Sequence, residues 1–138
     1  MEDPVIFKGV EELTLKRDNL LRRLRRQVSE YGRGRVDVDT LEETLLRLRK
    51  ARRELVKLLK EALNKVMGRE YVELIVTLVE FSYLVSINDE RELLLKVKAL
   101  TLRKGLEGGV VDKVNEDLNE VREFSEIASK LLNRYASS

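Results

Sequence analysis

Residues 39–68, DTLEETLLRLRKARRELVKLLKEALNKVMG, decide the fold of this chain. Most of the seam positions are apolar and recur in alternating steps of four and three, which is the spacing of a buried seam along an α-helix. Asp39 or Thr40 can cap the start of this helix, with Glu42 or Glu43 as the capping-box partner, and Gly68 ends it. The seam consists of Leu41, Leu45, Leu48, Arg52, Leu55, Leu59, Ala62 and Val66.

The rest of the chain repeats this helical period between its glycines. We expect an N-terminal tail over residues 1–9 and a loop from Gly32 to Asp39. Further helices are expected from about Val10 to Tyr31, Arg69 to Ile87, Arg91 to Lys104 and Val111 to Tyr135. The many β-branched residues of 69–87 leave a strand open there, but the length and the glutamate spacing favour a helix.

These segments predict an all-α fold, with one domain over residues 1–138. The domain is an antiparallel bundle of about five helices, with a long N-terminal helical hairpin over 10–67 and three further helices over 69–135. If 10–31 and 39–67 pair about their loop, Arg17 lies near Glu54 and Arg52 lies near Asp18. Each arginine on a seam would then meet a carboxylate.

The composition excludes many chemistries. Of 138 residues 38% are charged, yet the chain contains no histidine and no cysteine. A cysteine or histidine nucleophile, a histidine base, an ordinary zinc site and a disulfide are therefore absent. No catalytic motif replaces them, so we expect a protein that is not an enzyme and needs no cofactor. Glu70, Glu73 and Glu80 share a helix face, but without further converging oxygens they predict no metal site.

The charge content also suggests a source and a compartment. Many Lys, Arg and Glu residues with a single Gln indicate a thermophile, and we expect an archaeal one; a charge-rich mesophilic coiled coil is the alternative. No targeting segment and no uninterrupted apolar span is evident. We therefore expect a cytoplasmic protein with no membrane partner.

Basic residues are concentrated in the first half of the chain. Residues 1–68 carry 17 basic and 12 acidic side chains, whereas 69–138 carry 10 and 13. Two basic helices can follow a DNA or RNA backbone through its phosphates, and arginine suits bidentate phosphate recognition. The predicted phosphate contacts are Arg22, Arg23, Arg25, Arg26, Arg33, Arg35, Arg49, Arg53, Lys57 and Lys60. The alternative is a solvated face, or one neutralised by the acidic face of Val111–Tyr135.

The leucine seam offers a second kind of contact. A partner helix or a second copy of the chain could dock on Leu41, Leu45, Leu48, Leu55 and Leu59, which predicts a homo-oligomer or a partner protein. Packing within the bundle is the alternative.

Together these features predict a non-enzymatic helical interaction protein, a subunit of a nucleic-acid-associated assembly. The alternative is a structural homo-oligomeric bundle or an adaptor between proteins, without nucleic-acid binding. The chain is similar in size and helical character to small non-catalytic subunits of archaeal nucleic-acid machines, including those of RNA-guided defence complexes. This is a likeness of class and carries no motif.

Overall fold

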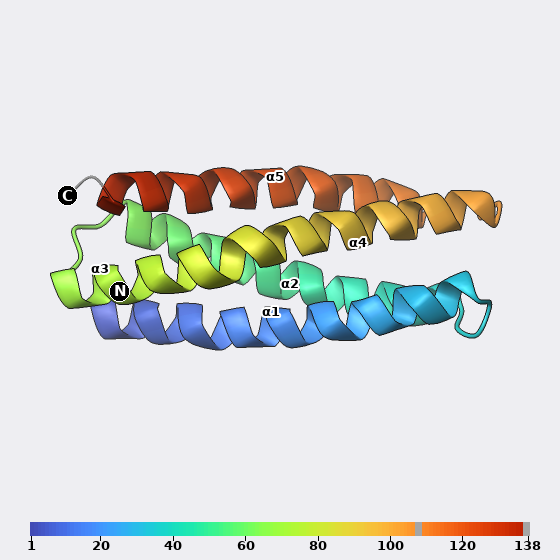
Figure 1. The fold of residues 1–138 in the computed structure, drawn as a ribbon, viewed down its shortest axis with the longest axis horizontal. Helices are drawn as coiled ribbons and strands as arrows, with labels where there is room; N and C mark the ends of the chain where they lie inside the picture. The colour runs from blue at the N-terminus through green and yellow to red at the C-terminus, as the bar shows by residue number, and fades with distance from the viewer. Residues whose placement is uncertain (107–108, 137–138) are drawn as a thin grey trace.

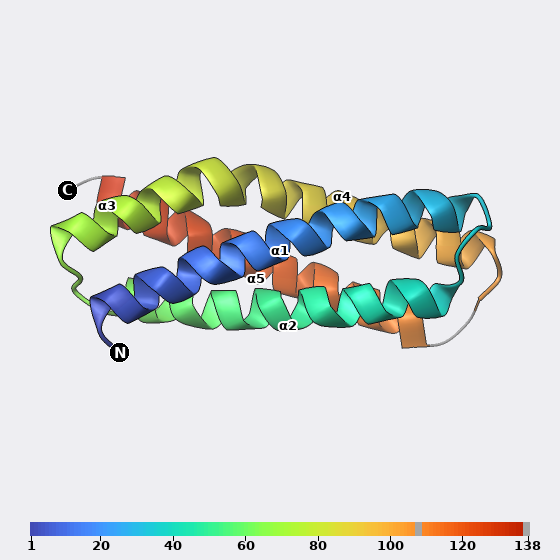
Figure 2. The same cartoon turned by 90° about the horizontal axis from the view of Figure 1, so that it is seen from below.

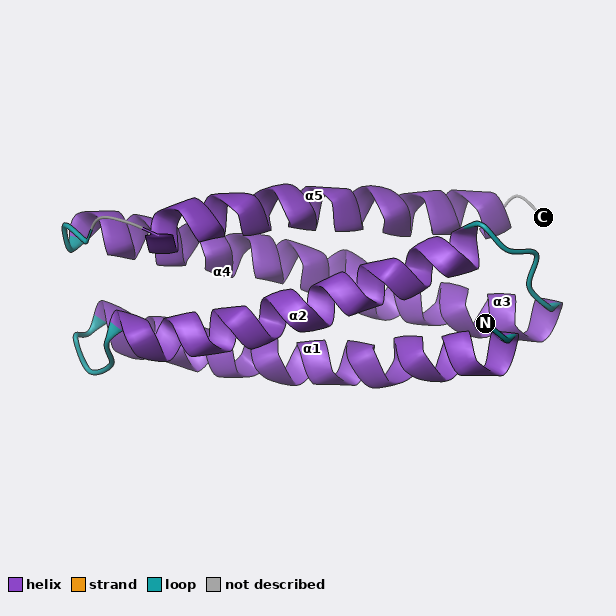
Figure 3. Cartoon of the chain, turned by 180° about the vertical axis from the view of Figure 1, so that it is seen from behind, coloured by secondary structure: helices purple, strands orange, loops and turns teal. Residues whose placement is uncertain are grey.

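The computed structural model describes residues 1–106 and 109–136, and these form an antiparallel bundle of four long helical rods (Figures 1 and 2). Every element of the described residues is a helix (Figure 3). The rods are α1 (Asp3–Gly32), α2 (Val38–Leu63), a continuous rod of α3 (Arg69–Leu78), the π-helical segment η1 (Val79–Tyr83) and α4 (Leu84–Arg103), and finally α5 (Gly109–Ala136). The α1 rod packs beside α2 and α4, and α5 packs beside the same two rods. The chain is therefore all-α, as expected.

The predicted number of helices is wrong because the third and fourth helices are one rod. Buried residues recur every four positions at Ile75, Val79, Tyr83 and Ile87. An α-helix has 3.6 residues per turn, so such a row drifts around the helix, and the wider turn of a π-helix absorbs that drift. Asn88 therefore does not cap a new helix; its side chain donates to Glu92 one turn further along.

The predicted tail over residues 1–9 is helical from Asp3 onward. Pro4 lies in the first turn of α1, where a missing N–H leaves no hydrogen bond unmade. Ile6 and Val10 are buried in the core. Gly9 does not interrupt the helix, because its missing side chain makes room for α2: a Cβ there would lie 2.6 Å from Leu58 Cδ1.

The ends of α2 differ from those expected. Asp37, rather than Asp39 or Thr40, is the N-cap, and its Oδ1 accepts from the backbone N–H of Thr40 at 3.0 Å. Gly34 takes the left-handed conformation (φ 73°) in the preceding turn. The helix ends at Leu63, so Val66 leaves the seam and is 88% exposed.

The core lies along the axis of the bundle. All four rods contribute, and the largest buried aromatic side chains are Tyr31, Tyr83 and Phe124. In the described residues no helix is both long enough and apolar enough to cross a membrane.

Candidate functional site

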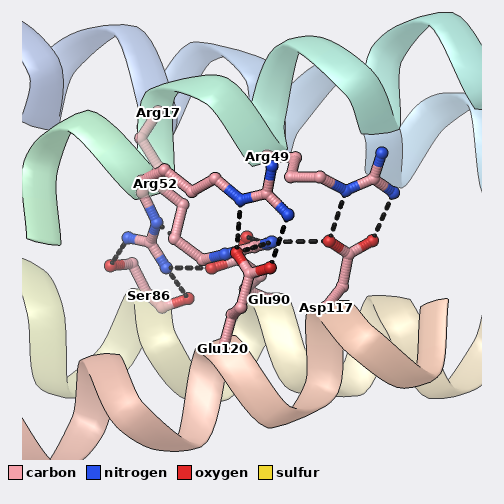
Figure 4. Close-up of polar contacts among 8 residues, drawn as sticks. Arg17, Arg49, Arg52, Ser86, Glu90, Asp117 and Glu120 are labelled. Carbon is pink, nitrogen blue, oxygen red and sulfur yellow. Dashed lines mark hydrogen bonds and ion pairs between the residues drawn. The ribbon is translucent and has the colours of Figure 1, made fainter. Parts of the chain in front are cut away.

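A network of buried charges crosses the middle of the bundle (Figure 4). At its centre the carboxylate of Glu90 on α4 accepts from Arg17 Nη2 of α1 at 2.9 Å and from Arg52 Nη1 of α2 at 3.1 Å. Arg17 also donates to the side chain and the carbonyl of Ser86, one turn from Glu90. The side chains of Arg17, Arg52 and Glu90 are almost completely shielded from water.

The network continues to α5 through Arg52. Its Nη2 donates to Asp117, which is buried, and to Glu120, which is partly exposed. Arg49 donates two hydrogen bonds to Asp117, at 2.7 and 2.8 Å. Arg53 does the same to Glu120, at 2.9 and 2.7 Å. These paired bonds fix the rotation and the height of α2 against α5.

Within the network, the electrostatics favour the ionised forms of Arg52 and Glu120. Burial disfavours the charged form of Arg52, but Glu90 and Asp117 outweigh this and raise its pKa. Burial likewise acts to raise the pKa of Glu120, but hydrogen bonds from Arg53 and Arg52 lower it below its ordinary value. A carboxylate held between arginines is a poor proton donor or acceptor near neutral pH. The arrangement therefore suits a structural role.

The sequence-based partners of the seam arginines are wrong. Arg17 binds Glu90 rather than Glu54, which is exposed, and Arg52 binds Glu90, Asp117 and Glu120 rather than Asp18. The prediction paired α1 with α2 alone. In the bundle both seams point to the common axis, where α4 and α5 supply the carboxylates.

The structure brings the predicted basic residues of α2 to the acidic face of α5. Arg49 belongs to the buried network, Arg53 extends it to the surface, and Lys60 Nζ lies 2.6 Å from Glu123. Lys57 is exposed beside these pairs and lines a hollow of about 400 Å³ between α2 and α5. Neutralisation within the molecule, the alternative considered from the sequence, thus accounts for three of these four residues.

The predicted residues of α1 and its following turn form a separate surface, which we call the α1 arginine face. It comprises Arg22, Arg23, Arg25, Arg26, Arg33 and Arg35, all of them exposed. Arg25 lies 3.2 Å from Asp89, and Arg33 and Arg35 lie 3.9 and 3.6 Å from Glu30. The surface lies toward the end of the bundle opposite the two termini (Figure 1).

Three arginines of this face form no ion pair with the part of the chain that the structure describes, although Asp18 interacts electrostatically with Arg22. Within the described residues, no carboxylate oxygen lies within the 4.0 Å limit of an ion pair from Arg22, Arg23 or Arg26. A shallow hollow of about 510 Å³ lies beside them, lined by Arg23, Arg26, Gln27, Ser29 and Glu30. Gln27 Oε1 is buried there without a hydrogen-bond partner. The α1 arginine face thus presents to an external anion three exposed arginines that form no ion pair with a described residue.

The five predicted partner-docking leucines lie inside the molecule. Leu41, Leu45, Leu48, Leu55 and Leu59 are buried against the other helices. The predicted docking of a partner on these leucines is therefore wrong: they pack within the bundle, and a partner could reach them only if the helices separated.

The glutamate stripe of α3 and η1 is solvent-exposed. Glu73 pairs with Arg69 at 3.3 Å, in the first turns of the helix. Among residues 1–106 and 109–136, no group of three or more Asp or Glu side chains is placed to hold a metal ion.

Sequence reasoning missed the acidic half of the network, namely Glu90 and Asp117. A signal was present: each acid occupies a position that the helical period assigns to the core, Glu90 between Ile87 and Leu94, and Asp117 between Val114 and Val121. A carboxylate at such a position predicts a buried cation facing it.

Comparison of the chain with protein-family models, with curated proteins and with solved structures finds no match. Together the fold and the site define a class of protein: an all-helical bundle with a charged core and an exposed arginine surface on α1.

Proposed function

We propose that this protein is a non-enzymatic helical subunit that contacts the phosphates of a nucleic acid through its α1 arginine face. The observation that carries the proposal is the contrast between its two basic surfaces. Arg49, Arg53 and Lys60 of α2 form ion pairs with α5, whereas Arg22, Arg23 and Arg26 are exposed and form no ion pair among the described residues.

The chemistry of the face suits the binding of phosphate. Arginine presents a planar fork of donors that fits a phosphate through two hydrogen bonds. Arg22, Arg23 and Arg26 fall within one and a half turns of α1, and Arg33 and Arg35 extend the positive surface around the turn. Together they give a charged strip along a rigid helix, with the spacing of successive phosphates within reach.

The same surface favours a duplex or another structured backbone over unpaired bases. Binding of single strands relies on aromatic side chains on which the bases stack. Tyr31, the nearest aromatic residue in the sequence, is buried and its ring is covered by Lys104. Phosphate contacts without base contacts predict affinity that is independent of sequence and sensitive to salt.

The test is duplex binding by the triple variant R22E/R23E/R26E, measured by fluorescence anisotropy at low salt. We expect wild-type protein to bind duplex DNA or RNA and the variant to bind at least about tenfold more weakly, because three phosphate contacts become repulsions. The matched control is K8E/K113E/K130E, which changes the net charge equally at exposed positions outside the face. We expect it to bind nearly as wild type does.

Each unfavourable outcome has a definite meaning. If wild-type protein does not bind either duplex at low salt, the proposed function is wrong. If both triple variants lose the same affinity, net charge and not the α1 arginine face is responsible. Circular dichroism shows whether each variant keeps its helices.

A further inference from the structure

One face of the α3–η1–α4 rod carries more exposed apolar residues than any other described element. Six of the twelve large hydrophobic side chains exposed in the described residues lie on this rod: Leu74, Phe81, Leu84, Val85, Leu95 and Leu102. Phe81 is 76% exposed and Val85 is 64% exposed. Isolated exposed leucines are ordinary in soluble proteins, whereas apolar residues gathered on one helix mark an interaction surface.

A groove runs along part of this face. Its volume is about 880 Å³, and it lies between α4 and α5. Leu84, Val85 and Leu95 line it from α4, Leu118 and Val121 line it from α5, and Asn88 lies among them. The charged side chains of Asp89, Arg91 and Arg122 also line the groove. The rod lies across the front of the bundle in Figure 1 and behind α2 in Figure 3, so no other helix of the described residues covers its outer side.

The charges along the rod are divided between its halves. Residues 69–87 carry one basic and three acidic side chains, and 88–104 carry five basic and three acidic side chains. Two of the acids in the second half, Asp89 and Glu90, are already bound by Arg25 and Arg17 of α1. In the first half Glu73 is paired with Arg69, which leaves Glu70 and Glu80. The outer surface is therefore acidic toward Glu70 and Glu80, and basic toward Lys96 and Arg103.

This division selects one kind of partner. A second copy of the rod running antiparallel places the acidic half of each copy on the basic half of the other, whereas a parallel copy places like charges together. The apolar residues between the two halves then meet near Asn88, the middle of the surface. The arrangement has twofold symmetry, as isologous dimers do.

The size of the surface is sufficient for a weak dimer. The rod is about 50 Å long and about 10 Å wide. It offers about 500 Å² per copy, or about 1,000 Å² in total, which is at the lower end of specific interfaces. We therefore propose that two copies of this protein associate in antiparallel fashion through the outer face of the α3–η1–α4 rod. This inference does not rest on the nucleic-acid proposal.

The test is sedimentation velocity of the whole chain from about 1 to about 500 µM, a range that covers weak association. We expect wild-type protein to pass from monomer to dimer. F81D/V85D should weaken dimerisation at least tenfold, because it places four charges in the apolar contact. The matched control L15D/L46D introduces the same charges at exposed leucines of α1 and α2, and should leave dimerisation unchanged.

Charge reversal tests the antiparallel arrangement. E73K/E80K makes both halves basic and K96E/R103E makes both halves acidic, so each should weaken dimerisation. The quadruple variant, in which the two halves exchange sign, should dimerise as wild type does. Wild-type protein that stays monomeric at the highest concentration overturns the proposal. So does a quadruple variant that dimerises no better than either double variant, or F81D/V85D that dimerises as wild type does.

Discussion

Glu90 is the residue on which the centre of the bundle depends. It is completely buried and accepts from Arg17 and from Arg52, two arginines of different helices. Replacing it by alanine leaves both guanidinium groups short of their counter-charge. We expect Glu90→Ala to lower the free energy of unfolding by about 3–5 kcal/mol, the cost of breaking a buried ion pair from one side. Urea denaturation measures the change.

An exposed acid provides the comparison. Glu126→Ala on α5 removes one negative charge from the surface and should change the free energy of unfolding by less than about 0.5 kcal/mol. Equal effects of the two substitutions would show that the network has no special role in stability.

Glu120 makes the free energy of unfolding depend on pH. Its arginine hydrogen bonds hold its pKa below the ordinary 4.5, so its contribution is complete above that value and is lost as the pH falls through the folded-state pKa. Asp18 contributes in the opposite direction: burial raises its pKa, so its effect on stability becomes more favourable as the pH falls. Between about pH 5 and pH 2 we expect Glu120→Gln to lose less stability than wild type and Asp18→Asn to lose more. Denaturation at several pH values tests both directions.

At the scale of elements, the start of α2 gives a direct comparison between sequence and structure. Asp37 caps the helix through the N–H of Thr40, and this contact also lowers the pKa of its carboxyl. We expect Asp37→Ala to cost about 1 kcal/mol. Asp39→Ala, at the cap position that the sequence favours, should cost only a few tenths of a kcal/mol through the helix dipole. If Asp39→Ala cost more stability than Asp37→Ala, Asp39 would be the N-cap, as the sequence predicted.

The helical period of the apolar residues predicted the helices. It did not predict the joining of two of them, where the chain departs from that period. The seam of residues 41–62 was recognisable because its leucines repeat regularly. The joining of Arg69–Ile87 to the next helix was not, since the π-helical turn at Val79–Tyr83 is stabilised by burial of Val79 and Tyr83 in the finished bundle. Polar residues such as Asn88 also resemble caps when they lie inside a helix.

At the scale of the molecule, the candidate site was predicted only in part, because it depends on contacts between helices. The sequence shows which residues are basic, but not which acids fold against them. Arg53 and Arg23 look alike in the sequence, yet one lies beside Glu120 and the other faces solvent. Only the packing of α5 on α2 distinguishes them, because the two helices are far apart along the chain.

The charged core also bears on thermal stability. Networks of several ion pairs gain in value at high temperature, because the cost of removing charges from water falls. The network here joins all four rods. We expect the protein to melt well above the range of about 45–65 °C typical of mesophilic domains. Calorimetry at neutral pH measures this, and a midpoint inside that range would contradict the thermophilic interpretation.

The salt dependence of duplex binding tests the central claim most directly. Each phosphate contact contributes about −0.9 to the slope of log K against log salt concentration for B-form DNA. If Arg22, Arg23 and Arg26 bind phosphates, the neutral variant R22Q/R23Q/R26Q should have a slope shallower by about 2.7 than that of wild type. A variant whose slope equals that of wild-type protein would contradict the assignment of the α1 arginine face.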